Sequence, residues 1–264
     1  MTYLKLSVCA AAIALAATTG AKADAFVNGS FETGDASGWT EGAGYRGGVD
    51  NNNLSTTDVL PGGSLYDSSI HHSAVVNLGD TDPNLGALLG SIVNSGNHSY
   101  RAEDTTSGGY TSAISQEVKN YTDASIFFAW KAVLQNGGHA EIESAEMLIE
   151  LTDETTGELL ISRIYNAGNG GGGVDSRFDS QGNFFYTPDW QIEQLAIDAS
   201  RSGHDFLLTV LGADCEPTGH TGYVYLDGFG NVVPPPTGAP EPLTLALFGA
   251  GLAGLTGMRL RKKR

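Results

Sequence analysis

Short runs in which hydrophobic and polar residues alternate recur through most of the chain. Residues 113–118 alternate strictly, whereas residues 125–134 and 205–211 are nearly continuous apolar runs. Alternation is typical of strands with one buried face, and apolar runs of this length are typical of central strands. We count about ten such segments between turn signals, with no long amphipathic helix before residue 243. The pattern predicts an all-β protein, an antiparallel β-sandwich.

The remaining segments can be assigned in the same way. Residues 145–152 and 158–165 flank a turn and predict a hairpin, whereas residues 41–67 predict a long surface loop. Residues 85–89 predict one helical turn and residues 168–173 a flexible glycine loop. We expect the first and last strands to pair. Further strands are predicted at residues 26–34, 38–39, 70–78, 184–186, 190–197 and 221–226.

The opening of this domain, FVNGSFETG from Phe26 followed by Gly38-Trp39, has a recognisable form. We expect Phe31 and Trp39 to face the core. The segment resembles the first strand of galactose-binding-like jelly rolls, a group that includes carbohydrate-binding modules. The resemblance implies a jelly-roll-like sandwich over residues 24–232.

Residues 1–23 form an export signal. Lys5 supplies the positive start, residues 6–17 are apolar, and Ala21-Lys22-Ala23 is a small-residue cleavage site. We therefore expect the mature chain to begin near Asp24 or Phe26 and to lie outside the inner membrane.

The other end has a proline-rich linker, residues 233–239, and a three-part tail, residues 240–264. The apolar run 243–258 predicts a hydrophobic helix of roughly 24 Å, shorter than the roughly 30 Å hydrocarbon core of a bilayer. The basic end should stay cytoplasmic. An ordinary tail anchor and a buried helix are the alternatives. The residues that define the two ends of the tail are Pro240, Glu241, Pro242, Arg259, Arg261, Lys262, Lys263 and Arg264.

In order and spacing this tail resembles the PEP-CTERM sorting signal of Gram-negative bacteria. The resemblance implies that the chain is transiently anchored in the inner membrane, that an exosortase removes the tail, and that the product reaches the cell surface or the extracellular matrix. It also implies a producer that exports polysaccharide or forms biofilm.

Charge narrows the list of partners. The whole chain has a formal charge of −16. Its basic residues are concentrated in the two ends, so the part between them carries about −22, a surface that repels nucleic acid and anionic lipid. Such a surface suits a secreted protein or one that binds calcium.

Two acidic residues are candidates for that calcium. Glu32 follows the opening strand and Asp227 lies at the end of the last one. If those strands are neighbours, the two carboxylates meet, and a Ca²⁺ ion would relieve their repulsion. The jelly-roll resemblance implies a structural calcium here. Alternatively, Asp227 caps the turn into Gly228 and Glu32 is solvated.

Cys215 is the one cysteine left after export, which excludes an intrachain disulfide. It is either a buried free thiol or a redox or intermolecular group. His139 and His220 are either metal ligands or loop histidines bonded to backbone. The surrounding segment, Asp214 to Gly228, resembles a strand-loop-strand near the end of some exported β-sandwich domains, but no activity follows from that.

Aromatic residues indicate sugar binding without locating it. Trp39, Trp130 and Trp190 are candidates to stack on sugars, although we expect at least two of them in the core. The alternatives, on glycine-rich loops, are Tyr45, Tyr66 and Tyr110.

No standard hydrolase or phosphate-binding motif is present, so no catalytic residue is predicted. The sequence favours a carbohydrate-binding or scaffolding module of exopolysaccharide. The alternatives are a structural matrix protein without a defined ligand and a polysaccharide hydrolase.

Overall fold

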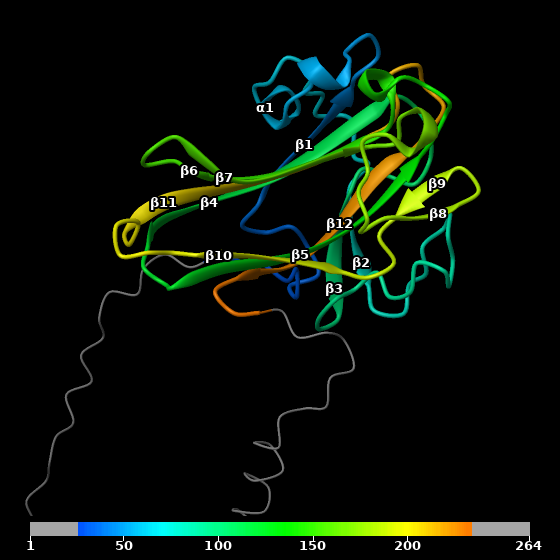
Figure 1. The fold of residues 1–264 in the computed structure, drawn as a ribbon. Helices are drawn as coiled ribbons and strands as arrows, with labels where there is room; N and C mark the ends of the chain where they lie inside the picture. The colour runs from blue at the N-terminus through cyan, green and yellow to red at the C-terminus, as the bar shows by residue number, and fades with distance from the viewer. Residues whose placement is uncertain (1–25, 234–264) are drawn as a thin grey trace, which may run out of the picture.

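The computed structural model describes residues 26–233, which form two antiparallel sheets packed face to face (Figure 1). Sheet A has the strand order β1-β4-β11-β6-β7. Sheet B has the order β2-β3-β12-β5-β9-β8, with β10 also paired to β5. The predicted antiparallel β-sandwich is confirmed.

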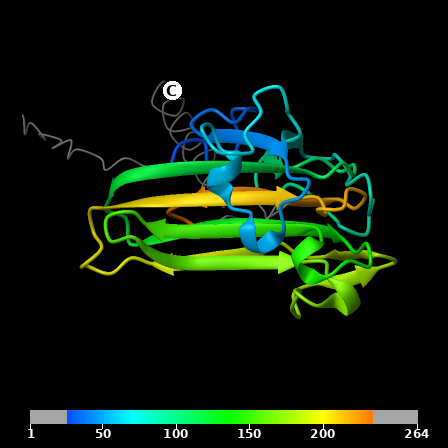
Figure 2. The same cartoon turned by 90° about the horizontal axis from the view of Figure 1, so that it is seen from above.

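Seen from above, the long strands of the two sheets run in closely similar directions (Figure 2). The strands are β1 (Thr40–Tyr45), β2 (Ala74–Asn77), β3 (His98–Ala102), β4 (Tyr110–Tyr121), β5 (Ser125–Gln135), β6 (Glu146–Asp153), β7 (Glu158–Asn166), β8 (Asp179–Gln181), β9 (Phe184–Tyr186), β10 (Gln191–Ala196), β11 (His204–Ala213) and β12 (Gly222–Gly230).

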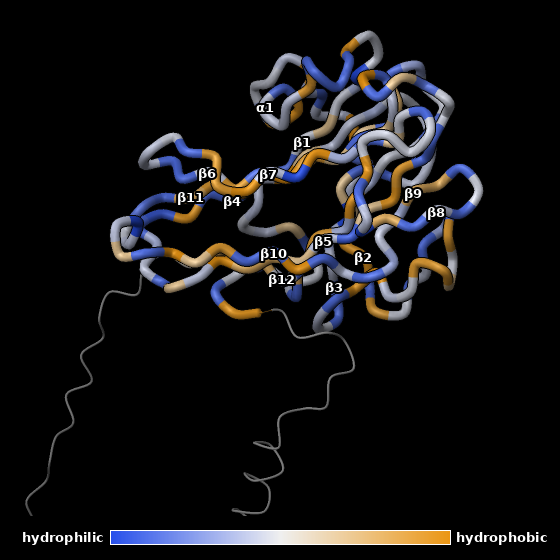
Figure 3. The backbone as a smooth tube through the Cα atoms, viewed as in Figure 1, coloured by the Kyte–Doolittle hydropathy of each residue, from blue (hydrophilic) through white to orange (hydrophobic). Residues whose placement is uncertain are grey.

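The main core lies between the sheets and includes buried residues from strands of both. Hydrophobic residues recur along the strands of both layers (Figure 3). Trp130 on β5 and Phe206 on β11 are completely buried there. The two apolar runs that predicted central strands thus belong to facing layers. Apolar burial of this kind supplies most of the driving force for packing two sheets.

The outer faces of both sheets are also partly covered. Leu85 and Leu89 from the loop 78–97 pack on Tyr223 and Tyr225 of sheet B. Asp82 of the same loop accepts hydrogen bonds of 2.8 Å from both tyrosine hydroxyls. On sheet A, residues around the short helix α1 (Thr56–Val59) pack against β4 and β11.

The opening segment differs from the prediction. Residues 26–39 form turns, not strands, because Asn28 and Phe31 adopt φ values of 50° and 56°, which an extended strand cannot contain. The predicted burial is nevertheless confirmed, since Phe31 is 0% and Trp39 is 9% exposed. Their rings stack with centroids 5.2 Å apart.

The predicted pairing of the first and last strands is wrong. β1 pairs with β4 in sheet A, whereas β12 lies between β3 and β5 in sheet B. The turn segment reaches β12 by one backbone hydrogen bond, in which the Phe229 N–H donates to the Gly29 carbonyl at 2.9 Å. Because residues 26–39 form turns, this segment makes no β-ladder with β12.

Of the predicted local elements, some are confirmed and others are wrong. The hairpin is confirmed as β6 paired with β7. The predicted loop 41–67 contains most of β1 and the helix α1, and residues 85–89 form turns without a helix. β3, which begins with polar His98 and Ser99, was not predicted.

Several predictions lie outside the described residues: the signal peptide 1–23, residues 234–239 of the linker, the tail 240–264 and its helix 243–258. Among residues 26–233, no helix has the length and apolar character needed to cross a membrane.

Candidate functional site

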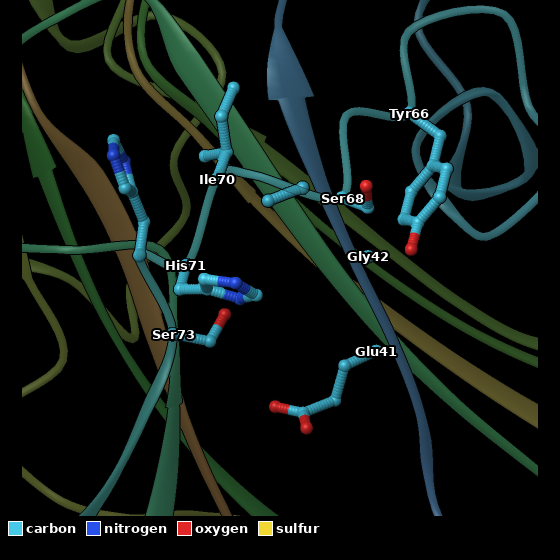
Figure 4. Close-up of a pocket in the computed structure, with 9 residues that line it drawn as sticks. Glu41, Gly42, Tyr66, Ser68, Ile70, His71 and Ser73 are labelled. Atoms are coloured by element: carbon cyan, nitrogen blue, oxygen red, sulfur yellow. The ribbon is translucent and has the colours of Figure 1, made fainter.

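A cleft of about 330 Å³ opens at the edge of sheet A, beside β1. Figure 4 shows Tyr66 on one side of Gly42, His71 and Ser73 on the other side, and Glu41 below them. The wall combines an aromatic ring with carboxylate, hydroxyl and imidazole groups. The full lining is Glu41, Gly42, Ala43, Tyr66, Ser68, Ile70, His71, His72 and Ser73.

Two glycines of β1 allow the cleft to form. A Cβ at Gly42 would lie 2.2 Å from the Val59 carbonyl oxygen, and one at Gly44 would lie 1.9 Å from that of Leu65. The segment from α1 to Tyr66 therefore lies directly on the strand, and Gly44 bridges to Tyr66. The sequence GAG within residues 42–44 sets the position of the Tyr66 ring.

The polar wall of the cleft is anchored from beneath. Glu41 accepts a hydrogen bond of 2.7 Å from the hydroxyl of Tyr100, a fully buried core residue. His72 Nδ1 lies 2.6 Å from Glu103 Oε1. This hydrogen bond, and the negative charges of Glu103 and Asp104, raise the pKa of His72 above its usual value although burial opposes them.

Glu103 is held in an unusual position. It is 0% exposed and has a φ of 67°, a left-handed conformation that is costly for a residue other than glycine. Its second oxygen accepts from the Ser112 hydroxyl at 2.7 Å. Hydrogen bonds to both carboxylate oxygens of Glu103 therefore stabilise this strained conformation behind the cleft.

The three candidate tyrosines gather at this end of the sandwich. Tyr45 and Tyr110 are opposite each other in the β1–β4 ladder, with ring centroids 5.5 Å apart. Tyr66 lines the cleft and is 37% exposed, and Tyr45 is 49% exposed. His72 connects the two groups, since its ring lies 4.5 Å from that of Tyr110.

The tryptophans lie elsewhere. Trp39 and Trp130 belong to the core, as expected for at least two of the three. Trp190 is half-buried on the outer face of sheet B, where its indole N–H donates to the Ser91 carbonyl at 3.1 Å.

A second cleft, of about 410 Å³, lies over β6 and β7 on the outer face of sheet A. Its lining includes Glu146, Glu150 and Ile164, and none of its lining residues is aromatic. The first cleft is therefore the better candidate for a sugar site.

The two predicted calcium ligands contact the same segment, residues 94–98. One carboxylate oxygen of Asp227 accepts hydrogen bonds from the backbone N–H groups of Asn94 and Ser95. One carboxylate oxygen of Glu32 likewise accepts hydrogen bonds from the N–H groups of Asn97 and His98. Burial, with a contribution from the Glu32 charge, raises the pKa of Asp227 to about 7.

Both side chains carry oxygen ligands of the type that Ca²⁺ binds, but the strand pairing predicted to bring them together is absent among the described residues. Each carboxylate keeps a second oxygen whose side-chain contacts, at 3.4 Å and 3.3 Å, are long. In the described part of the chain no basic side chain forms an ion pair with Glu32 or Asp227. Oxygen ligands with uncompensated negative charge are what Ca²⁺ prefers.

Cys215 is a buried, free thiol. His139 and His220 lie beside it, at the place where β5 ends and β12 begins. Sequence reasoning did not find His72 and Glu103, which are 31 residues apart and have no motif in common. It did single out the three tyrosines, but the prediction that all are exposed on glycine-rich loops holds for Tyr66 alone. Tyr45 ends β1 and Tyr110, which is half-buried, begins β4.

No protein-family model and no curated protein matches this chain. Solved structures of similar fold include TmCBM61 in complex with beta-1,4-galactotriose, which is 13% identical with a TM-score of 0.41 and is matched over 78% of this chain and 96% of that one. CBM28, a carbohydrate-binding module specific for non-crystalline cellulose, is 12% identical with a TM-score of 0.36, over 77% and 92%.

A third similar structure is the Stig cyclase Fisc from Fischerella sp. TAU, 13% identical with a TM-score of 0.38, over 79% of this chain and 95% of that one. Carbohydrate-binding modules and a cyclase thus occur together among the matches. At these identities and scores we take neither ligand nor activity from them.

Proposed function

We propose that the protein is an exported carbohydrate-binding module of the cell surface or exopolysaccharide matrix, with its glycan site in the cleft beside β1. The observation that supports this most directly is the composition of that cleft. A half-exposed aromatic ring, Tyr66, faces polar groups of Glu41, His71 and Ser73 across a hollow of sugar size.

Each part of the wall has a role in this proposal. The Tyr66 ring stacks on the apolar face of a pyranose, while the carboxylate of Glu41 accepts hydrogen bonds from sugar hydroxyls. The Tyr100 hydroxyl fixes Glu41 at 2.7 Å, so the carboxylate is positioned before the ligand arrives. Preorganisation of this kind lowers the entropic cost of binding.

Delivery rests on the two ends of the sequence. In the proposal, residues 1–23 direct export, an exosortase recognises residues 240–264 in the inner membrane, and the mature domain is released. Glu32 and Asp227 hold a structural Ca²⁺ that links the opening turn to β12 through residues 94–98.

The test is a glycan array probed with the purified protein, followed by titration of the best glycan. We expect Tyr66→Ala to weaken binding roughly fivefold, which corresponds to about 1 kcal/mol for one aromatic contact. Tyr66→Phe keeps the ring and is the matched control, so it should bind almost as wild type.

The other outcomes separate the alternatives. A folded protein that binds no glycan on the array is a structural matrix protein. Release of labelled fragments from a polysaccharide would identify a hydrolase, and equal affinity of the alanine and phenylalanine variants would place the sugar away from this cleft.

A further inference from the structure

Three potential metal ligands meet at the end of the sandwich that holds the loop between β11 and β12. Cys215 follows β11 by two residues, His220 precedes β12 by two, and His139 comes four residues after β5. The loops are brought together by the sheet, because Gly222 of β12 pairs with Leu134 of β5. The Cys215 N–H also donates to the His220 carbonyl at 2.8 Å.

The ligand atoms point at one another. His139 Nε2 lies 3.2 Å from His220 Nδ1, and the Cys215 Sγ atom lies 3.4 Å from the same nitrogen. All three ligand atoms are within 4.8 Å of one another. A tetrahedral zinc ion places two nitrogen ligands roughly 3.3 Å apart, and nitrogen and sulfur roughly 3.5 Å apart. The observed spacings match the edges of such a site.

Hydrogen bonding alone does not satisfy this group. Each nitrogen of a neutral imidazole either donates or accepts one hydrogen bond. His220 Nδ1 can therefore bond to His139 Nε2 or to Cys215 Sγ, and the other neighbour is left without this partner. A cation between the three atoms satisfies them together. We propose that His139, Cys215 and His220 form a Cys–His₂ site for a zinc-type divalent transition metal.

The surroundings support the proposal. A Cβ at Gly137 would lie 2.1 Å from His220 Nδ1 and 2.6 Å from His139 Cδ2, so the absence of a side chain there lets the two rings converge. Burial raises the pKa of the Cys215 thiol, and the backbone N–H groups of His220 and Gly219 that reach its sulfur oppose this only in part. A bound metal must therefore displace the thiol proton.

Three protein ligands leave a fourth tetrahedral position for water or another ligand group. Cys215 is buried, but both histidines are only half-buried, so this position is on the solvent side. The metal fastens the loop between β11 and β12 to the loop after β5. None of the three ligands lines the cleft that holds Tyr66 and Glu41, so the test of metal binding is independent of the test of sugar binding.

The experiment is a titration of the full chain, purified with a reductant and stripped of metal, with Co²⁺. We expect one equivalent to produce a sulfur-to-cobalt charge-transfer band and the intense visible bands of tetrahedral cobalt, and Zn²⁺ to bleach both. Cys215→Ser should abolish the charge-transfer band, and His220→Ala should weaken cobalt binding at least tenfold. His71→Gln, a histidine outside the cluster, should leave the titration unchanged.

A second measurement uses only the wild-type chain and does not depend on how a variant folds. Bound Zn²⁺ should slow alkylation of Cys215 at least tenfold. The proposal is overturned if folded wild-type protein gives neither cobalt bands nor protection of the thiol, or if the charge-transfer band persists in Cys215→Ser.

Discussion

At the scale of single residues, two basic side chains of this acidic domain are buried within it. Arg46 is completely buried and donates to the carbonyls of Asp214 at 3.0 Å and Val49 at 2.8 Å. Lys131, 2% exposed, donates to the Leu89 carbonyl at 2.6 Å, and burial lowers its pKa to about 8. A buried cation is costly unless it is hydrogen-bonded. The bonds from Arg46 and Lys131 to backbone carbonyls therefore link loops to the two sheets.

Glu146 is the buried acid with the clearest consequence for stability. Burial raises its pKa from 4.5 to about 8, and the positive charge of Arg46 only partly offsets this. Between these values the carboxyl is protonated in the folded state and ionised in the unfolded state. Its stabilising contribution is therefore complete below about pH 4.5 and is lost as the pH rises through about 8.

We expect Glu146→Gln to flatten the fall in unfolding free energy over this window, where one proton corresponds to about 1.4 kcal/mol per pH unit. Urea unfolding at several pH values measures the slope. Glu154→Gln, at an exposed position, is the control and should keep the wild-type slope. Parallel curves for Glu146→Gln and wild type would contradict the prediction.

At the scale of elements, the hydrophobic pattern predicts the strands whose burial is itself periodic or continuous. β5 and β11 could be predicted from the sequence because most of their residues are buried and apolar. β3 was not, because it is short and mixes polar with apolar residues, with Ser99 buried and Arg101 half-buried. The pairing of β12 also depended on a turn geometry, at Asn28 and Phe31, that no pattern of polarity encodes.

The segment 94–98 is the element most sensitive to calcium in our proposal. Calcium at one hundred times its dissociation constant would add about 2.7 kcal/mol to stability. For a domain of this size that raises the unfolding midpoint by roughly 5 to 10 °C. The rise should appear when Ca²⁺ is added back after EDTA, and should vanish in Asp227→Asn and in Glu32→Gln.

An unchanged midpoint in the wild-type protein would remove both residues from a metal site. Mg²⁺ in place of Ca²⁺ is the control, since Mg²⁺ demands near-ideal octahedral geometry and gives up its waters reluctantly.

At the scale of the whole molecule, composition and charge predicted an acidic all-β domain, and the fold agrees. The candidate cleft was only half predictable. Tyr66 stands out on a glycine-rich loop, but Glu41, His72 and Glu103 become neighbours through sheet pairing and loop packing. No spacing in the sequence records those contacts.

The sorting proposal makes a prediction about the full chain in a Gram-negative host that contains an exosortase. We expect Pro240→Ala combined with Pro242→Ala to leave the tail uncut, so that the protein stays in the membrane fraction. Mass spectrometry of the released product and fractionation of the cells measure this. Pro234→Ala, in the linker, should be processed normally, and release of both variants alike would exclude the motif.

The two borders of sheet A are unlike. The outer side of β1 is occupied, since the Asp67 N–H donates to the Ala43 carbonyl and Gly44 bridges to Tyr66. The outer side of β7 has no strand neighbour among the described residues, and its one backbone contact of this kind is at its end, where the Asn166 N–H donates to the Gly173 carbonyl at 3.1 Å. The strand also carries Leu159 and Ile164, which are 50% and 54% exposed. A second molecule can therefore extend this layer by strand addition along β7 but not along β1.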